Sequence, residues 1–223
     1  MEIKIEKIIR SKRKTIGLQV NENGALIVRA PFQVSEEVIL KVIEKHRGWI
    51  EKKKQEIEKR VKNFPEKKFT ADEDFLYLGR SYKLKIVDEL KEPFVFNDAF
   101  FLSKDALPFA REIFIKWYKK EAYKKIYERT SEFAKKYGFK YNKINITNAQ
   151  KRWGSCSPNG NLNFSWRLIM APLPVVDYVI IHELIHLEIK NHGKSFWAKV
   201  KNLMSDYEKY EKWLKENGYL LRI

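Results

Sequence analysis

The segment from His182 to His192 constrains the fold most, because it holds three of the chain's four histidines. His182 and His186 are four residues apart, so on a helix both rings project from one face about one turn apart. A straight helix would carry His192 more than one turn beyond His186. The chain therefore has to leave the helix soon after His186 if the third ring is to join the other two. Asn191 and Gly193 flank the third histidine, and both residue types tolerate the backbone conformations that end a helix.

Imidazole rings brought together in this way predict a metal site. Two histidines at this spacing suit a tetrahedral zinc ion, and three protein ligands leave the fourth position for water, as in catalytic zinc sites. Glu183 follows the first histidine and can reach a water molecule in that position without being a ligand itself. The sequence therefore predicts a zinc site of the catalytic kind in this segment.

The third ligand has one alternative in the sequence. Cys156 is the chain's single cysteine and lies 26 residues before His182. Peptide deformylases also pair an upstream cysteine with an H-E-x-x-H motif, but the glycine-rich loop that accompanies that cysteine is absent from this chain. His192 is therefore favoured as the third ligand, and Cys156 is expected to be a small, partly buried strand residue.

Hydrophobic periodicity predicts an α+β fold whose first region, residues 1–104, is rich in strands and holds one helix. Ser35 is the expected N-cap of that helix. Its apolar stripe includes His46, which is expected to pack in the core, and a linker is expected near Pro65. Hairpins are predicted at three pairs of alternating segments; their turns lie at Asn23-Gly24, near Gly79, and at Asn97-Asp98.

The second region, residues 105–223, is predicted to be a separate domain that consists mostly of helices. Its helices are expected to be amphipathic, with apolar residues at helical spacing. The predicted elements are a long helix that ends at Gly138, an antiparallel pair of strands over 144–146 and 162–166, a helix from Pro172 through the histidines to about Lys190, and a final helix over 194–217.

Composition limits the environment in which the protein works. The chain has a formal net charge of +16, and residues 111–167 hold 14 Lys or Arg against four Asp or Glu. Such a surface attracts phosphates or acidic proteins, although a lysine-rich surface also keeps a protein soluble. A single cysteine excludes an internal disulfide framework and fits a reducing compartment. No apolar run reaches the roughly eighteen residues of a membrane helix, and no secretory signal is recognisable. We therefore expect a cytoplasmic protein with no membrane partner.

Several segments together resemble a known family. The stretches KRWGSCS, HELIHLEIKNHGKSFW and LMSDYEKYEKWLKENG are similar to the YgjP-like zinc metallopeptidases, which are zincins related to the SprT-like family. The likeness extends to RSKRKTIGLQV and KHRGWIEKK, and so covers most of the chain. It implies a β-rich N-terminal region ahead of a zincin-like metallopeptidase domain over residues 105–223. It also implies one Zn²⁺ per chain held by His182, His186 and His192, with Glu183 as the catalytic carboxylate. The histidine spacing equals that of the metzincins, but Ile189 replaces their helix-ending glycine and no Met-turn is recognisable.

The resemblance implies hydrolysis of peptides or unfolded proteins, with a zinc-activated water and Glu183 as general base. A second group is expected to stabilise the oxyanion. The hairpin between Trp153 and Trp166 offers an edge to which an extended substrate can add as a strand. The candidates for the oxyanion-stabilising or substrate-binding group are Arg152, Asn191, Tyr207 and Tyr210.

Two alternative functions keep the zinc site. YbeY-like zinc endoribonucleases have three histidines at the same spacing, and a basic chain can bind RNA. Their motif usually lacks the glutamate that this chain has as Glu183, which favours peptide hydrolysis. The other alternative is a nucleic-acid-associated protease of the SprT-like kind, in which the basic segment 111–152 binds DNA or RNA.

Overall fold

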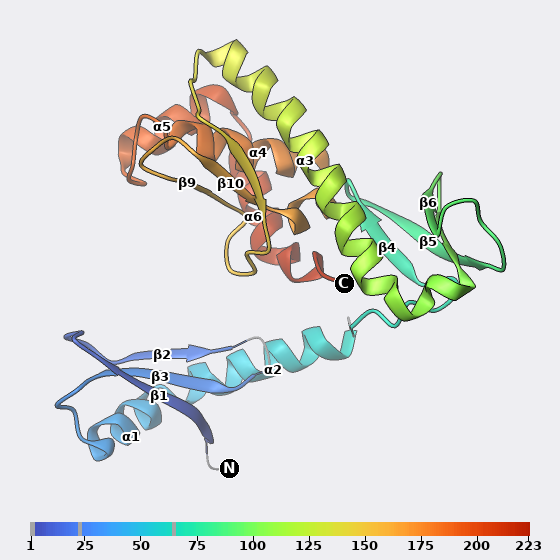
Figure 1. The fold of residues 1–223 in the computed structure, drawn as a ribbon. Helices are drawn as coiled ribbons and strands as arrows, with labels where there is room; N and C mark the ends of the chain where they lie inside the picture. The colour runs from blue at the N-terminus through green and yellow to red at the C-terminus, as the bar shows by residue number, and fades with distance from the viewer. Residues whose placement is uncertain (1–2, 22–23, 64–65) are drawn as a thin grey trace. The chain divides into compact units, whose positions relative to one another are not determined.

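The computed structural model describes residues 3–21, 24–63 and 66–223. It confirms the α+β fold, because the described residues form helices and three small sheets joined by loops (Figure 1). The chain divides into two compact units, Met1–Pro65 and Glu66–Ile223. The linker predicted near Pro65 lies outside the described residues, although the units divide there. Within the described part of the chain, no helix has the length and apolar character needed to cross a membrane.

The first unit is a small sheet with two helices. The predicted hairpin is confirmed, since its two strands pair antiparallel. A further strand, which was not predicted, pairs with the second hairpin strand in the parallel direction. Gly24, two residues before the return strand, has a φ of 77°, as a tight turn requires. Its neighbour Asn23 lies outside the described residues. The elements are β1 (Ile5–Ser11), β2 (Gly17–Val20), β3 (Leu26–Pro31), α1 (Glu36–Lys45) and α2 (Arg47–Asn63).

The helical part of this unit differs from the prediction in one place. Ser35 caps α1 as expected, since its hydroxyl accepts a hydrogen bond from the backbone N–H of Val38 at 3.4 Å. The predicted single helix is interrupted at His46, just before Gly48, a residue type of low helix propensity. The prediction that His46 packs in the core is wrong: its side chain is exposed at this break.

The second unit begins with a four-stranded sheet. Both predicted hairpins are confirmed, and the sheet order is β4-β5-β7-β6. Their turns use residues with positive φ, Gly79 at 78° and Asp98 at 56°. The strands are β4 (Asp74–Tyr77), β5 (Arg80–Val87), β6 (Phe94–Phe96) and β7 (Phe100–Ser103).

The long helix α3 (Ala110–Tyr137) joins this sheet to the rest of the second unit. It ends at Gly138, whose φ of 78° confirms the predicted helix stop. The Tyr118 hydroxyl donates a hydrogen bond to the backbone carbonyl of Leu76 in β4 at 2.7 Å. Because the sheet and α3 share one buried core, the domain boundary expected at residue 104 falls inside the second unit.

A three-stranded sheet precedes the histidine segment. The predicted antiparallel pair is present, but it consists of β9 (Gly154–Cys156) and β10 (Leu162–Ser165), joined by the turn at Pro158-Asn159-Gly160. The strand predicted over 144–146 is β8 (Ile144–Thr147), which pairs with β10 in the parallel direction, contrary to the prediction. The sheet order β8-β10-β9 leaves β9 at an edge.

The remaining helices carry the histidine segment. The helix α4 (Leu173–Ile185) starts between the two predicted prolines and ends five residues earlier than expected. The predicted final helix is two helices, α5 (Lys194–Leu203) and α6 (Tyr207–Asn217). Between them, Met204 is extended at φ −148° and ψ 91°, and Ser and Asp, which favour turns and caps, follow it. Short 3₁₀ helices lie at η1 (Lys104–Phe109), η2 (Trp166–Met170) and η3 (Gly218–Leu220).

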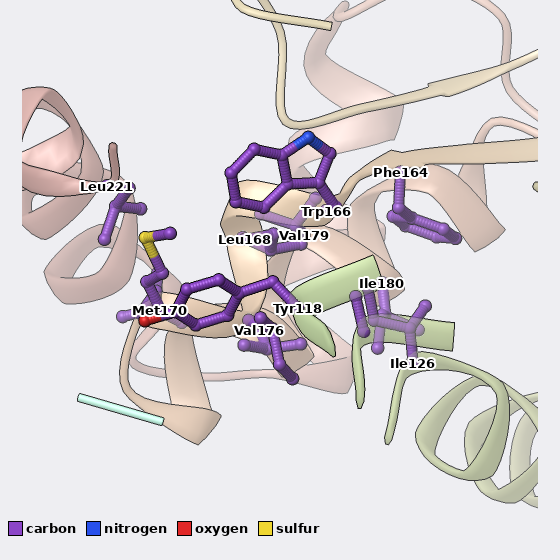
Figure 2. Packing of buried hydrophobic residues seen from close by; sticks show 14 of the residues in the cluster. Tyr118, Ile126, Phe164, Trp166, Leu168, Met170, Val176, Val179, Ile180 and Leu221 are labelled. Atoms are coloured by element: carbon purple, nitrogen blue, oxygen red, sulfur yellow. The ribbon is translucent and has the colours of Figure 1, made fainter. Parts of the chain in front are cut away.

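The core of the second unit holds α4 in place. Figure 2 shows buried side chains from α3, β10, η2 and α4 packed together. Tyr118 and Trp166 stack with their ring centroids 5.8 Å apart. Arg129 on α3 also pairs with Asp177 on α4 through two hydrogen bonds of 2.7 Å. Packing and this ion pair together fix the helix that carries the first two histidines.

Candidate metal centre

The histidine-bearing helix α4 is apolar on nearly all sides, as expected of a helix in a protein interior. His182 lies in its last turn, and His186 is the residue that ends it. The chain continues in turns over residues 186–188, and the side-chain oxygen of Asn191 accepts a hydrogen bond from the backbone N–H of Gly193 at 3.2 Å. This turn returns His192 to the other two rings, as the sequence pattern predicts.

The three imidazoles converge on one point. Their Nε2 atoms are separated by 3.2 Å between His182 and His186, 3.1 Å between His186 and His192, and 2.9 Å between His192 and His182. Zinc–nitrogen bonds of about 2.0–2.1 Å at tetrahedral angles set ligand nitrogens about 3.3–3.4 Å apart. The observed spacing is therefore close to that of three ligands of one ion.

The protonation of these rings also suits a metal. The Nδ1 atom of His186 lies 2.9 Å from the carbonyl oxygen of Ile189. Because a carbonyl only accepts, Nδ1 carries the proton, and Nε2 of the neutral ring keeps its lone pair. Burial lowers the pKa of His182 to about 3, with repulsion from His186 and His192 adding to the effect. Three lone pairs at this distance repel one another, and a shared cation removes that repulsion.

An aromatic platform supports the cluster. Phe196 of α5 is fully buried, and its ring centroid lies 4.6–4.8 Å from the centroids of all three histidine rings. Trp197 lies beside His182 and His192, with centroids 6.0 and 5.9 Å away. These apolar rings restrict the rotation of the imidazoles and limit water on that side. Phe196 therefore both packs in the core and supports the histidine cluster.

Glu183 is a buried carboxyl next to the cluster. Its side chain is 5% exposed, and burial raises its pKa to about 8, although the positive charge of Arg152 acts in the opposite direction. Its Oε2 atom has no hydrogen-bond partner among the described residues, and neither does Nδ1 of His182. Burying a carboxyl oxygen without a hydrogen-bond partner costs free energy unless water or a cation binds to it. The site therefore has a titratable group suited to proton transfer near neutral pH.

Gly154 on β9 makes room for this carboxyl. A Cβ atom built on Gly154 would lie 2.6 Å from both Cγ and Oε1 of Glu183. Sequence reasoning did not identify Gly154 as a site residue, because its position beside α4 depends on how a distant strand packs. Its place in the RWGSC stretch was the only signal.

The four oxyanion candidates differ in their surroundings. Arg152 is exposed and acts electrostatically on Glu183. The hydroxyl of Tyr210 donates to Asp206 at 2.7 Å, and the side chain of Asn191 is used in the turn before His192. Tyr207 is buried, with its ring stacked on Trp197 at a centroid distance of 5.4 Å. Among the four, Arg152 is the one whose charge acts on the carboxyl of the site.

Tyr178 is a site residue that the sequence reasoning missed. It precedes His182 by one helical turn, and the two ring centroids are 5.9 Å apart. Burial raises the pKa of its phenol, and the charges of Glu211, Tyr207 and Glu183 add to this effect. Its spacing of four residues from His182 is the signal that could have found it.

Cys156 lies outside the histidine cluster. Within residues 3–21, 24–63 and 66–223, the group of His, Cys, Asp and Glu side chains spaced to hold a metal ion consists of the three histidines. The thiol is partly buried and contacts the carbonyl oxygen of Ser157 at 3.5 Å, and burial raises its pKa. These surroundings are those of a small strand residue.

Comparison with known proteins gives the family. Residues 14–217 match the YgjP-like family, described as a metallopeptidase domain. The chain belongs to the YgjP-like metallopeptidase family. The resemblance found in the sequence is thus confirmed, and membership implies a metal-dependent peptidase that acts on peptides or proteins. No curated protein matches this YgjP-like chain.

Two solved structures are similar to part of this YgjP-like protein. One is the metallopeptidase zymogen abylysin of Pyrococcus abyssi, with 19% identity and a TM-score of 0.38, over 44% of this chain and 96% of that chain. The other is the metallopeptidase zymogen jannalysin of Methanocaldococcus jannaschii, with 28% identity and a TM-score of 0.36, over 43% of this chain and 96% of that chain.

Proposed function

We propose that this protein is a zinc peptidase of the HExxH type, with one ion held by His182, His186 and His192. The observation that carries the proposal is the convergence of three imidazole Nε2 atoms, 2.9–3.2 Å apart, next to a buried glutamate. Nitrogen ligands of this number and spacing suit zinc, and three of them leave an open coordination position. The family supports a metal-dependent peptidase, and the roles of the individual residues are our proposal.

Each ligand has a distinct support from the chain. His182 is held neutral by burial, so its ring is ready to bind a cation. His186 is oriented by the Ile189 carbonyl, the kind of outer contact that fixes a ligand's tautomer. His192 is positioned by the turn at Asn191. When bound, zinc would make water nucleophilic near neutral pH and polarise the scissile carbonyl.

Glu183 is the proposed general base. Its carboxylate takes a proton from the attacking water and later delivers it to the leaving amine. Burial raises the pKa of Glu183 to about 8 against the opposing charge of Arg152, and a nearby cation favours the ionised form that a base requires. Gly154 positions this carboxyl by leaving space for it. Arg152 is our choice among the four candidates for the group that stabilises the oxyanion, because it carries a positive charge near Glu183.

The edge strand β9 is the proposed binding site for the substrate backbone. The N–H of Ser165 bonds to the carbonyl of Trp153, and the N–H of Ser157 bonds to the carbonyl of Asn161. In an antiparallel pair, residues that bond to the neighbouring strand alternate with residues that do not. The backbone N–H and C=O groups of Gly154 and Cys156 therefore point away from β10. On that free edge of β9, an extended peptide can add as a further strand.

A direct test gives the zinc-loaded protein and its Glu183→Gln variant an unfolded protein and a structured RNA. We expect cleavage of the protein, and loss of that cleavage in the variant with zinc retained. RNA cleavage that survives the substitution would instead favour the YbeY-like endoribonuclease. Salt-dependent binding of DNA or RNA, weakened when lysines of segment 111–152 are replaced, would favour the nucleic-acid-associated protease.

A further inference from the structure

A cavity of about 330 Å³ opens beside His182 and Glu183. Its walls come from three elements that are distant in sequence: β9 with the residue before it, α4, and α6. This volume lies at the small end of the range for ligand sites, so the cavity suits a single side chain of a bound peptide. Its position next to the proposed general base places such a side chain close to the scissile bond.

Part of the cavity wall is apolar. Trp153, Val179 and Leu214 supply it, each from a different element. The Trp153 ring rests against Gly218, where a Cβ atom would lie 2.8 Å from Cζ2. The indole therefore has little freedom to swing out and close the cavity. A long hydrocarbon stem is the kind of group that such walls bury.

The polar part of the cavity is an ion pair on α6. Glu211 and Lys215 lie one helical turn apart, and Nζ of the lysine is 2.8 Å from Oε1 of the glutamate. The Glu211 side chain is 33% exposed, whereas the Lys215 side chain is 70% exposed. The carboxylate is thus held at the wall, and the ammonium reaches it from solvent. An exposed ion pair of this type contributes little stability, so another cation can take the place of the lysine.

The cavity is lined by more carboxyl groups than ammonium groups, in contrast to the chain as a whole. Two carboxyl groups, Glu183 and Glu211, line it together with one ammonium group, Lys215. The chain as a whole has a net charge of +16. An acidic side chain entering the cavity would meet both carboxyl groups, and a basic one would find a partner in Glu211.

We propose that this cavity binds a basic side chain of the substrate, arginine or lysine, and that Glu211 selects it. The methylene stem packs on Trp153, Val179 and Leu214, and the cationic end pairs with Glu211 in place of Lys215. Arginine fits best, because its planar guanidinium can stack on an indole and bind a carboxylate through two hydrogen bonds. This inference rests on the proposed peptidase function and names its substrate class.

The test uses the zinc-loaded full chain and peptides that are identical except for Arg, Leu or Glu at one position beside the scissile bond. We expect the highest kcat/KM for the Arg peptide. Glu211→Gln lowers kcat/KM for the Arg peptide by about tenfold and changes the Leu peptide by less than about threefold. Glu216→Gln is the matched control, because this exposed glutamate lies on the same helix outside the cavity and leaves the preference unchanged.

A second variant separates selection from misfolding. Lys215→Gln removes the competing ammonium, so kcat/KM for the Arg peptide rises by about two- to fivefold, a gain that a folding defect cannot produce. The proposal is overturned if the enzyme does not prefer the basic peptide, or if Glu211→Gln leaves that preference intact.

Binding gives a readout that does not depend on cleavage. Calorimetry with the zinc-loaded Glu183→Gln variant compares the Arg and Leu peptides, with and without Glu211→Gln. Arg-selective binding that requires Glu211 supports the cavity assignment, even where the wild-type protein cleaves no peptide and the proposed function fails. Equal binding of both peptides overturns the assignment while leaving a peptidase activity unaffected.

Discussion

Gly154 and Glu183 are in such close contact that the first has no room for a side chain. A Cβ atom at Gly154 would lie 2.6 Å from Oε1 of Glu183 and 2.8 Å from its Cδ. The glycine φ is not in the left-handed region, so space and not backbone conformation requires glycine at this position. The strand β9 thereby fixes the position of the proposed general base on α4.

Replacing this glycine tests that relationship. Gly154→Ala forces the Glu183 carboxyl to shift, and displacement of a catalytic group by about 1 Å can lower the rate about 100-fold. We expect kcat to fall by about 10- to 100-fold while zinc content stays at one per chain, measured by peptide cleavage and atomic absorption. Gly48→Ala is the control, since a Cβ there meets open space. If Gly154→Ala kept the kcat of the wild type, the position of the Glu183 carboxyl would not depend on the absence of a side chain at residue 154.

Burial of Glu183 predicts a pH dependence of stability in the zinc-free protein. Its pKa of about 8 in the folded state exceeds the ordinary value of 4.5, so its protonated form is favoured on folding. The stability it contributes is complete below about pH 4.5 and is lost as pH rises through about 8. Between these two pH values, the free energy of unfolding of the wild type should fall by roughly 3–5 kcal/mol relative to that of Glu183→Gln. Urea unfolding with a chelator present measures this difference. If the free energies of unfolding of the two proteins depended on pH in the same way, the raised pKa of Glu183 would be refuted.

Local signals were enough to predict many elements of this fold. Ser35, Gly79 and Gly138 act within a few residues of their own positions, as a helix cap, a turn and a helix stop. The turn after His186 was predictable for the same reason, because its Asn-His-Gly stretch favours leaving the helix. The convergence of the three histidines could therefore be predicted without knowledge of any long-range contact.

Contacts between distant segments were not predictable from these patterns. Strand β8 alternates apolar residues like any strand, and its parallel pairing with β10 depends on where α3 places it. Gly154 joins the site only because β9 packs on α4. The boundary expected at residue 104 lies inside the second unit for a related reason, since the core shared by β4–β7 and α3 does not follow the change from strands to helices in the sequence.

The third ligand can be assigned by zinc content. His192→Ala should weaken zinc binding by more than the roughly 10- to 100-fold that loss of an outer contact causes. Cys156→Ser should retain full affinity, because the thiol lies outside the histidine cluster. The matched control is His46→Ala, which removes the exposed histidine of the first unit and should change nothing. Competition with a chromophoric chelator measures the zinc affinity of all three variants. If Cys156→Ser lost zinc and His192→Ala retained it, the third ligand would be Cys156.

The ion pair between Arg129 and Asp177 links α3 to the helix that bears the histidines. Two hydrogen bonds of 2.7 Å join them, and the Asp177 side chain is only 11% exposed. Asp177→Ala leaves a guanidinium partly buried without this partner, so we expect a loss of about 2–3 kcal/mol in the free energy of unfolding. Glu132→Gln removes the exposed partner of the same arginine and should cost less than about 0.5 kcal/mol. Urea unfolding of the zinc-loaded proteins distinguishes the two, and equal losses would mean that the buried pair adds no more than a surface contact.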